Sequence, residues 1–385
     1  MKSDSAKIIY LDYAATTPVD PRVIKKMLKY LGPNDCFANP SSAHIYGREA
    51  ALAVKKAREQ LADLLDIEAN TIVWTSGATE SIHLALRGSA QAYSDKGRHI
   101  ITCATEHLAV LETCHQLERE GFVVTYLQPN SAGLLTLEHV EKNIRPDTIL
   151  LSIAHVNNEI GVIQDIASLG RFAKTKGILF HVDAAQSLGK LPLPLSHLPV
   201  DLMSFSGHKL YAPKGIGALY IKPNIRVYAQ LHGGGQEWGL RSGTLPTHQI
   251  VAMGEACYLA QQTMESEQAR LRTLSDYLLS ELYALGQVYL NGSDVLRLSS
   301  IMNIRFEGNA GNALQPVLPG LAVSSGAACQ SLNRNVASHV LKSLGLDRRQ
   351  ILSSLRISIG RFTTEAQLRF ALIQIRSAVT LLRSL

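Results

Sequence analysis

The chain has 385 residues, of which 38 are Lys or Arg and 32 are Asp or Glu, giving a net charge of +6. With 46% hydrophobic residues it can fill a large core, which excludes wholesale disorder. The basic residues are spread along the chain and cluster only in pairs such as Lys55 and Lys56. We therefore expect no direct nucleic-acid binding.

The cysteines favour a reducing compartment, and the apolar segments argue against a membrane span and a signal peptide. The five cysteines are odd in number and contain no CxxC pair, which argues against a disulfide framework and against a zinc site. No span reaches transmembrane length, and the N-terminus lacks the apolar core of a signal peptide. The expectation is a cytoplasmic protein with no membrane association and no metal.

The N-terminal region predicts a short strand at 8–11 and two helices. Asp20 is a suitable N-cap and Pro21 a suitable first residue for a helix that Gly32-Pro33 ends. An alanine-rich helix follows over 47–65.

From residue 71 onward, strands and helices alternate. The strands are apolar throughout, which is typical of a mostly parallel sheet covered by helices on both faces. Ligands in such sheets gather at the carboxyl ends of the strands. The predicted strands are 71–75, 99–104, 123–127, 149–154, 178–182, 202–205 and 217–221, with helices opening at 77–79 and covering 108–120 and 166–176.

After a long helical region at 249–284 the pattern changes. Short strands mix with helices, and the last helix opens with a capping box from Thr364 to Gln367. This mixture predicts a smaller α+β domain. Its strands are expected at 288–290, 301–306 and 355–359, and its helices at 338–344 and 364–382.

A lysine follows the apolar strand at 202–205. Lys209 comes after Ser206, Gly207 and His208 in a small polar turn. Burial at a strand end makes a lysine amine a better nucleophile toward aldehydes. Taken alone, Lys209 is more simply explained as a side chain that reaches solvent from the strand end.

Three other strand ends carry groups suited to a flat, phosphorylated ring. Residues 77–79 open a helix, where backbone N–H groups favour a phosphate, and His107 suits stacking on a ring. Asp183 suits the proton of a pyridine nitrogen, and Gln186 suits a phenolic oxygen. Each group also has a structural explanation: a packed turn, a surface histidine or a helix cap. Together with Lys209 and in this chain order, they predict pyridoxal 5'-phosphate.

At this point the sequence resembles the cysteine desulfurases, which are class V-type members of the fold-type I pyridoxal-phosphate enzymes. The resemblance covers nearly the whole chain. It rests on LDYAATTP (11–18), NPSSAH (39–44), TSGATES (75–81), TEH (105–107), HVNNEIGVIQDI (155–166), HVDAAQSLGK (181–190), DLMSFSGHKLYAPKGIGALY (201–220), RSGTLP (241–246), VSSGAAC (323–329) and SSLRISIGRFTTE (353–365).

The resemblance implies a large domain over 16–258 with a mostly parallel seven-stranded sheet, and a small domain from 1–15 and 259–385. It also implies a homodimer. Lys209 carries the cofactor, and Asn158 and Arg356 bind the substrate carboxylate. The other residues implied to hold the cofactor are Ala78, Thr79, His107, Asp183, Gln186, Ser206 and His208, with Thr244 reaching across from a second subunit.

Cys329 lies in a run of small residues, where most cysteines would be inert thiols. The resemblance implies that it attacks the sulfur of bound L-cysteine, so that Cys329 becomes a persulfide and alanine is released. The SSGxAC form resembles the long-loop subgroup, which passes sulfur to acceptor proteins for iron–sulfur clusters, tRNA or DNA.

Two alternatives remain at the sequence level. One is a selenocysteine lyase or related aminotransferase; Cys329 argues against an ordinary aminotransferase, which needs no second nucleophile. The other is a non-catalytic sulfur-trafficking platform, against which Lys209, Asp183, Arg356 and Cys329 argue together. Because the sequence ends at Leu385, soon after the last helix, we expect weak binding to a general iron–sulfur scaffold and a different or additional acceptor at 330–339.

Overall fold

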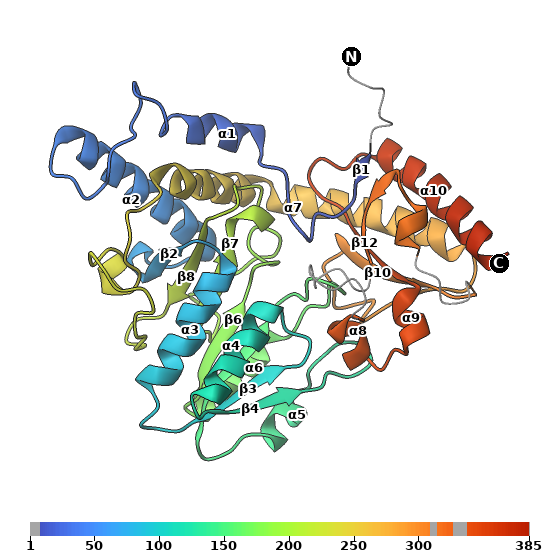
Figure 1. The fold of residues 1–385 in the computed structure, drawn as a ribbon, viewed down its shortest axis with the longest axis horizontal. Coiled ribbons are helices and arrows are strands. Elements are labelled where there is room, and N and C mark those ends of the chain that lie inside the picture. The colour runs from blue at the N-terminus through green and yellow to red at the C-terminus, as the bar shows by residue number, and fades with distance from the viewer. Residues whose placement is uncertain (1–7, 309–313, 326–336, 385) are drawn as a thin grey trace.

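The structure is a computed structural model that describes residues 8–308, 314–325 and 337–384. Its larger part is a seven-stranded sheet with helices on both faces (Figure 1). The strands are β2 (Ile72–Thr75), β3 (His99–Cys103), β4 (Val123–Leu127), β5 (Thr148–Ala154), β6 (Leu179–Asp183), β7 (Leu202–Ser206) and β8 (Gly217–Ile221).

The strand order is β2-β8-β7-β6-β5-β3-β4. Neighbouring strands from β7 to β4 pair in parallel, whereas β8 runs antiparallel to both β7 and β2. The predicted mostly parallel sheet is confirmed. Because β8 runs against all the others, its start lies at the same edge as the carboxyl ends of the other six strands.

Two helical layers bury the strands on both faces, which is why these strands are apolar throughout. α3 (Ala78–Ala92) and α4 (Leu108–Arg119) cover one face. The opposite face packs against α1 (Pro21–Leu28), α2 (Ile45–Leu65), α5 (Leu137–Lys142), α6 (Ile166–Thr175) and the start of α7 (Thr247–Tyr283). Asp20 caps α1 as predicted, by accepting a hydrogen bond from Arg22 N.

A second hydrophobic core surrounds an antiparallel sheet in the order β12-β13-β10-β9. α7 contributes to both cores, the first through Ile250–Ala260 and the second through Leu271–Leu282 (Figure 1). The remaining elements are β1 (Ile9–Tyr10), β9 (Val288–Leu290), β10 (Ile301–Phe306), β11 (Leu321–Ala322), β12 (Ser324–Ser325), β13 (Ser354–Ser358), α8 (His339–Ser343), α9 (Arg348–Leu352) and α10 (Glu365–Arg383).

Most predicted elements agree with the structure to within a few residues, and the predicted capping box begins α10. The short elements α5, α9, β11 and β12 were not predicted. The predicted domain limits, 16–258 against 1–15 and 259–385, stay a prediction.

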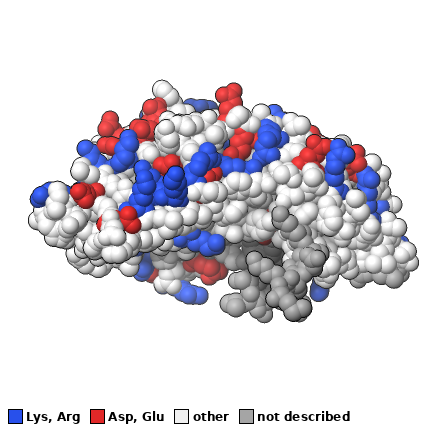
Figure 2. All heavy atoms as spheres, turned by 90° about the horizontal axis from the view of Figure 1, so that it is seen from above, with Lys and Arg blue, Asp and Glu red and all other residues white. Residues whose placement is uncertain are grey.

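Among helices in the described ranges, none combines the length and apolarity needed to cross a bilayer. Acidic and basic side chains are intermingled on the face seen in Figure 2.

Candidate active site

One large cavity, of about 630 Å³, lies where the carboxyl ends of β2, β3, β5, β6 and β7 meet the second core. Its volume falls in the usual range for small-molecule sites. All but two of the predicted site residues line it. They are Ala78, Thr79, His107, Asn158, Asp183, Gln186, Ser206, His208, Lys209 and Arg356.

Asp183 and His107 contribute a carboxylate and an imidazole from the ends of β6 and β3, which lie on either side of β5. Asp183 is the last residue of β6, 7% exposed, and its Oδ1 accepts a hydrogen bond from Ala185 N at 2.9 Å. Burial raises the pKa of Asp183. A cation bound in the cavity would lower this pKa again by stabilising the carboxylate. His107 caps α4 by accepting from Ala109 N at Nδ1 (3.1 Å), and desolvation by the surrounding cavity wall lowers the pKa of this solvent-accessible ring. The neutral ring therefore carries its proton on Nε2.

Lys209 follows β7 in a single 3-10 turn, Gly207–Lys209. Its Nζ donates to the carbonyl oxygens of Ala14 (2.5 Å) and Ala15 (2.7 Å), which belong to the N-terminal loop of the cavity wall. His208 contacts Thr16 Oγ1 of the same loop through Nδ1 at 3.1 Å. Burial and the nearby lysines lower the pKa of His208 to about 4, so its ring is neutral near pH 7.

The predicted phosphate position lies at the N-terminus of α3, a fifteen-residue helix that begins at Ala78. The backbone comes close to the sheet here: a Cβ atom on Gly217 would lie 2.5 Å from Gly77 Cα. Glu80 in the first turn is paired with Arg241 at 2.7 Å, which offsets its negative charge. The first backbone N–H groups of a helix have no partner within the helix and favour an anion.

Arg356 and Asn158 also line the cavity and contact each other. Arg356 stands on β13, is 3% exposed, and donates from Nη1 to the carbonyl oxygen of Asn158 at 3.0 Å. Its Nη2 donates to Asp12 Oδ1 at 2.8 Å and to Ser324 Oγ at 3.0 Å. The predicted substrate arginine is therefore already paired with a carboxylate of its own chain.

Two predicted site residues do not line the cavity. Cys329, with positions 330–336 of the predicted acceptor segment, lies outside the described residues. Thr244 is exposed and lies outside this cavity. Its loop is held to α3 by the ion pair of Arg241 with Glu80.

Comparison with known proteins places this cavity in a family. The family model described as Aminotransferase class-V matches residues 9–370. The cysteine desulfurase IscS of Klebsiella pneumoniae subsp. pneumoniae is 55% identical over 380 residues, which span 98% of this chain and 94% of that protein. The chain belongs to the cysteine desulfurases.

Solved structures resemble the desulfurase along most of its length. A NifS-like protein has a TM-score of 0.90 at 37% identity, with 97% of this chain and 100% of that chain covered. A structure described as SspA in complex with cysteine has a TM-score of 0.82 at 39% identity, covering 92% and 100%. The predicted fold class, enzyme class and pyridoxal 5'-phosphate dependence are thereby confirmed.

The residues of the cavity fit this cofactor. A pyridinium nitrogen would supply the positive charge that the buried Asp183 carboxylate calls for. The N-terminus of α3 offers backbone donors to a phosphate, and Lys209 offers the amine for an aldehyde. The flat His107 ring borders the same space. The individual roles of these residues stay predictions.

Sequence reasoning missed two residues of the site. Asp12, in the LDYAATTP motif, pairs with Arg356. Lys190 donates to Gln186 Oε1 at 2.9 Å, which turns the amide nitrogen of Gln186 toward the carbonyl oxygen of Ala14 at 2.8 Å. Burial lowers the pKa of Lys190 to about 7. Its spacing of four residues from Gln186 was the available signal.

Proposed function

We propose that the desulfurase takes the sulfur of L-cysteine as a persulfide on Cys329, releases L-alanine, and passes the sulfur to acceptor proteins. The observation that carries this proposal is the convergence of Lys209, Asp183 and Arg356 on one cavity. The solved relative described as a complex with cysteine supports the substrate. Acceptors for iron–sulfur clusters, tRNA or DNA remain the candidate recipients.

The overall step balances without an external oxidant. The Cβ–S bond of cysteine breaks and an S–S bond to Cys329 forms, so the transferred sulfur is oxidised while the β-carbon is reduced to the methyl group of alanine. The proton of the Cys329 thiol offsets the proton that the methyl group gains. The persulfide then carries sulfur in a form that an acceptor thiol can attack.

The residues of the cavity would bind the cofactor and the substrate. When bound, pyridoxal 5'-phosphate would supply the electron sink that weakens bonds at the substrate α-carbon. Asp183, shielded from water, would hold the proton of the pyridine nitrogen, and Gln186 would donate toward the phenolic oxygen. Arg356 and Asn158 would orient the α-carboxylate. The Nε2–H group of His107 would donate a hydrogen bond inside the cavity.

The proposal is tested with two variants of the holoenzyme. Lys209→Ala should lose the lysine adduct that borohydride fixes, whereas Cys329→Ser should keep it. Cys329→Ser should nevertheless form almost no alanine or sulfide. In wild type, mass spectrometry after a cysteine pulse should find one added sulfur on Cys329. Near-normal alanine formation by Cys329→Ser would overturn the persulfide route.

We also propose that the active unit is a homodimer, with Thr244 completing the partner's phosphate site. Apolar side chains lie exposed from α1 to the start of α2, where a second subunit would cover them. They include Leu28 (55% exposed), Phe37 (58%), Tyr46 (58%) and Leu52 (65%). The exposed position of Thr244, outside its own cavity, supports the same arrangement.

Subunit mixing tests this dimer. Lys209→Ala and Thr244→Ala subunits are unfolded together, refolded and assayed at limiting cofactor. If Thr244 acts across the interface, mixed dimers hold one intact site, and about a quarter of wild-type activity should return because half of the dimers are mixed. Activity no higher than that of the separate variants would place Thr244 in its own subunit's site.

A further inference from the structure

Arg356 has little hydrogen-bonding capacity left for a substrate. A guanidinium has five N–H donors and binds a carboxylate bidentately along one of two edges, Nε with Nη2 or Nη1 with Nη2. Both edges include Nη2, whose two hydrogens go to Asp12 and Ser324. Among described residues, the buried Nε has no partner. A substrate carboxylate that binds bidentately therefore has to share Nη2 with Asp12 or replace one of the partners of Nη2.

The backbone of Asp12 is fixed, so its carboxylate is a permanent feature of this wall. Its carbonyl oxygen accepts from Ala15 N (3.0 Å) and from the Tyr10 hydroxyl (3.0 Å). Asp12 also forms a parallel bridge with Ser358, on the same strand as Arg356. The Asp12 side chain is 18% exposed and lines the cavity. Any anion bound to Arg356 consequently lies next to a second negative charge.

We propose that Asp12 makes the substrate position selective for amino acids over simple carboxylates, because only a ligand with an α-ammonium group offsets the repulsion from Asp12. This inference rests on the proposed role of Arg356 as the substrate-carboxylate residue. L-Cysteine carries an α-ammonium and an α-carboxylate group, whereas a mercapto carboxylate of the same length carries only the negative charge. Asp12 thus acts as a specificity-determining residue at the entry step.

The test uses 3-mercaptopropanoate, which is cysteine without its α-ammonium group. Its binding to the holoenzyme is measured by calorimetry for wild type and Asp12→Asn. Asparagine keeps an oxygen that accepts from Arg356 and removes the charge. The dissociation constant should fall about tenfold in the variant, since a like charge beside the bound anion is removed. The dissociation constant of L-alanine, a zwitterion, should change much less.

Two controls keep the outcome interpretable. Asp95→Asn removes the same charge from a surface pair with Arg226 and should leave both constants unchanged. Asp12→Ser provides a second neutral variant if Asp12→Asn fails to retain cofactor absorbance. Unchanged or weaker 3-mercaptopropanoate binding in both neutral variants would overturn the selectivity role.

Arg356→Gln separates this inference from the function on which it rests. If Arg356 binds the substrate carboxylate, Arg356→Gln should weaken 3-mercaptopropanoate binding. Weakening in Arg356→Gln without tightening in Asp12→Asn would refute the role of Asp12 alone. No weakening in Arg356→Gln would refute the substrate role of Arg356, and the inference with it.

Discussion

The carbonyl oxygen of Ala14 shows how single residues build the cofactor site. It accepts from Lys209 Nζ at 2.5 Å and from Gln186 Nε2 at 2.8 Å, and Lys190 holds the other end of the Gln186 amide. Lys209 and Gln186 were predicted as cofactor residues, but their shared acceptor comes from a loop nearly two hundred positions away in the chain. One backbone oxygen thus accepts hydrogen bonds from two side chains that are predicted to bind the cofactor.

Buried histidines give a prediction for acid stability. Burial lowers the pKa of His155 to about 4 and of His181 to about 3, and the pKa of His208 also lies at about 4. These rings are neutral in the folded protein, whereas in the unfolded chain they bind protons below about pH 6.5. The unfolded state therefore gains protons first, and the free energy of unfolding should fall as pH drops from 6.5 toward 4.

Each such histidine contributes up to about 1.4 kcal/mol per pH unit within this window. Equilibrium urea unfolding at several pH values between 7.5 and 5 measures the slope. His155→Gln should make the slope shallower, because one of the three rings no longer titrates. A free energy of unfolding that stays level from pH 6.5 to 5 would contradict the prediction.

At the level of elements, the antiparallel β8 shapes the end of the cavity where the phosphate is predicted to bind. Its first residue, Gly217, packs against Gly77 at the start of α3, and a Cβ there would lie 2.5 Å from both Gly77 Cα and Phe205 O. The sheet and the helix end can approach this closely only because Gly217 has no side chain. The position of the α3 N-terminus therefore depends on a strand more than a hundred residues later in the chain.

Gly217→Ala should push the start of α3 away from the sheet. Overpacking of this kind costs about 1–3 kcal/mol of stability, and the displaced helix end should bind phosphate more weakly. The measurements are the melting temperature and the cofactor retained after gel filtration. Gly320→Ala is the matched control, since its nearest neighbour, Phe370 Cε1, would be 3.6 Å from the added Cβ. Full cofactor retention by Gly217→Ala would refute this explanation.

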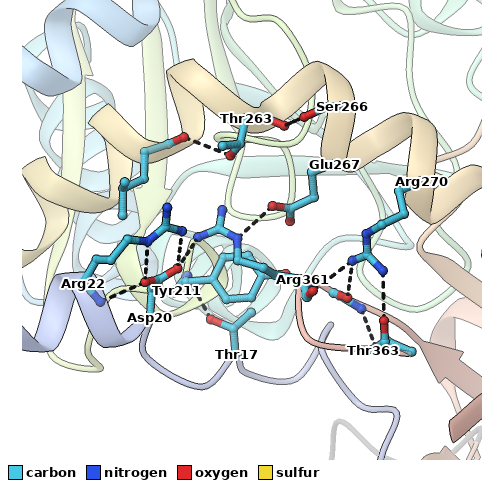
Figure 3. A network of polar contacts seen from close by, with 12 residues as sticks. Thr17, Asp20, Arg22, Tyr211, Thr263, Ser266, Glu267, Arg270, Arg361 and Thr363 are labelled. Carbon is cyan, nitrogen blue, oxygen red and sulfur yellow. Dashed lines mark hydrogen bonds and ion pairs between the residues drawn. The ribbon is translucent and has the colours of Figure 1, made fainter. Parts of the chain in front are cut away.

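At the scale of the whole molecule, a buried ionic network joins the two cores (Figure 3). Arg361 donates to Asp20 at 2.8 Å and to Glu267 of α7 at 2.7 Å, and its guanidinium lies over the Tyr211 ring at 4.2 Å. The neighbouring guanidinium of Arg22 holds the pKa of Asp20 far below its usual range. The N-terminal loop, the Lys209 segment and the C-terminal region are thereby fixed to one another.

Arg361→Met should destabilise the protein by about 3–5 kcal/mol, because it leaves the Glu267 carboxylate without its cation and the buried Asp20 with Arg22 alone. Arg369→Met serves as the control. Its pair with Glu365 is a surface contact, with side chains 66% and 57% exposed, and such pairs are worth about 0–1 kcal/mol. Denaturant unfolding of both variants compares the two losses. Equal losses would show that the network does not join the cores.

The alternating elements, the cofactor class and most residues of the cavity could be predicted from the sequence, because local patterns and strand-end motifs carry that information. The sequence could not show which side chains from distant segments pair with each other. Asp12 and Arg356 are separated by 344 positions, and only the approach of the N-terminal loop to β13 makes them an ion pair. The antiparallel direction of β8, the hydrogen bond of Lys190 to Gln186 and the ion pairs of Arg361 were likewise visible only in the tertiary structure. Each of these depends on packing between segments that no local pattern relates.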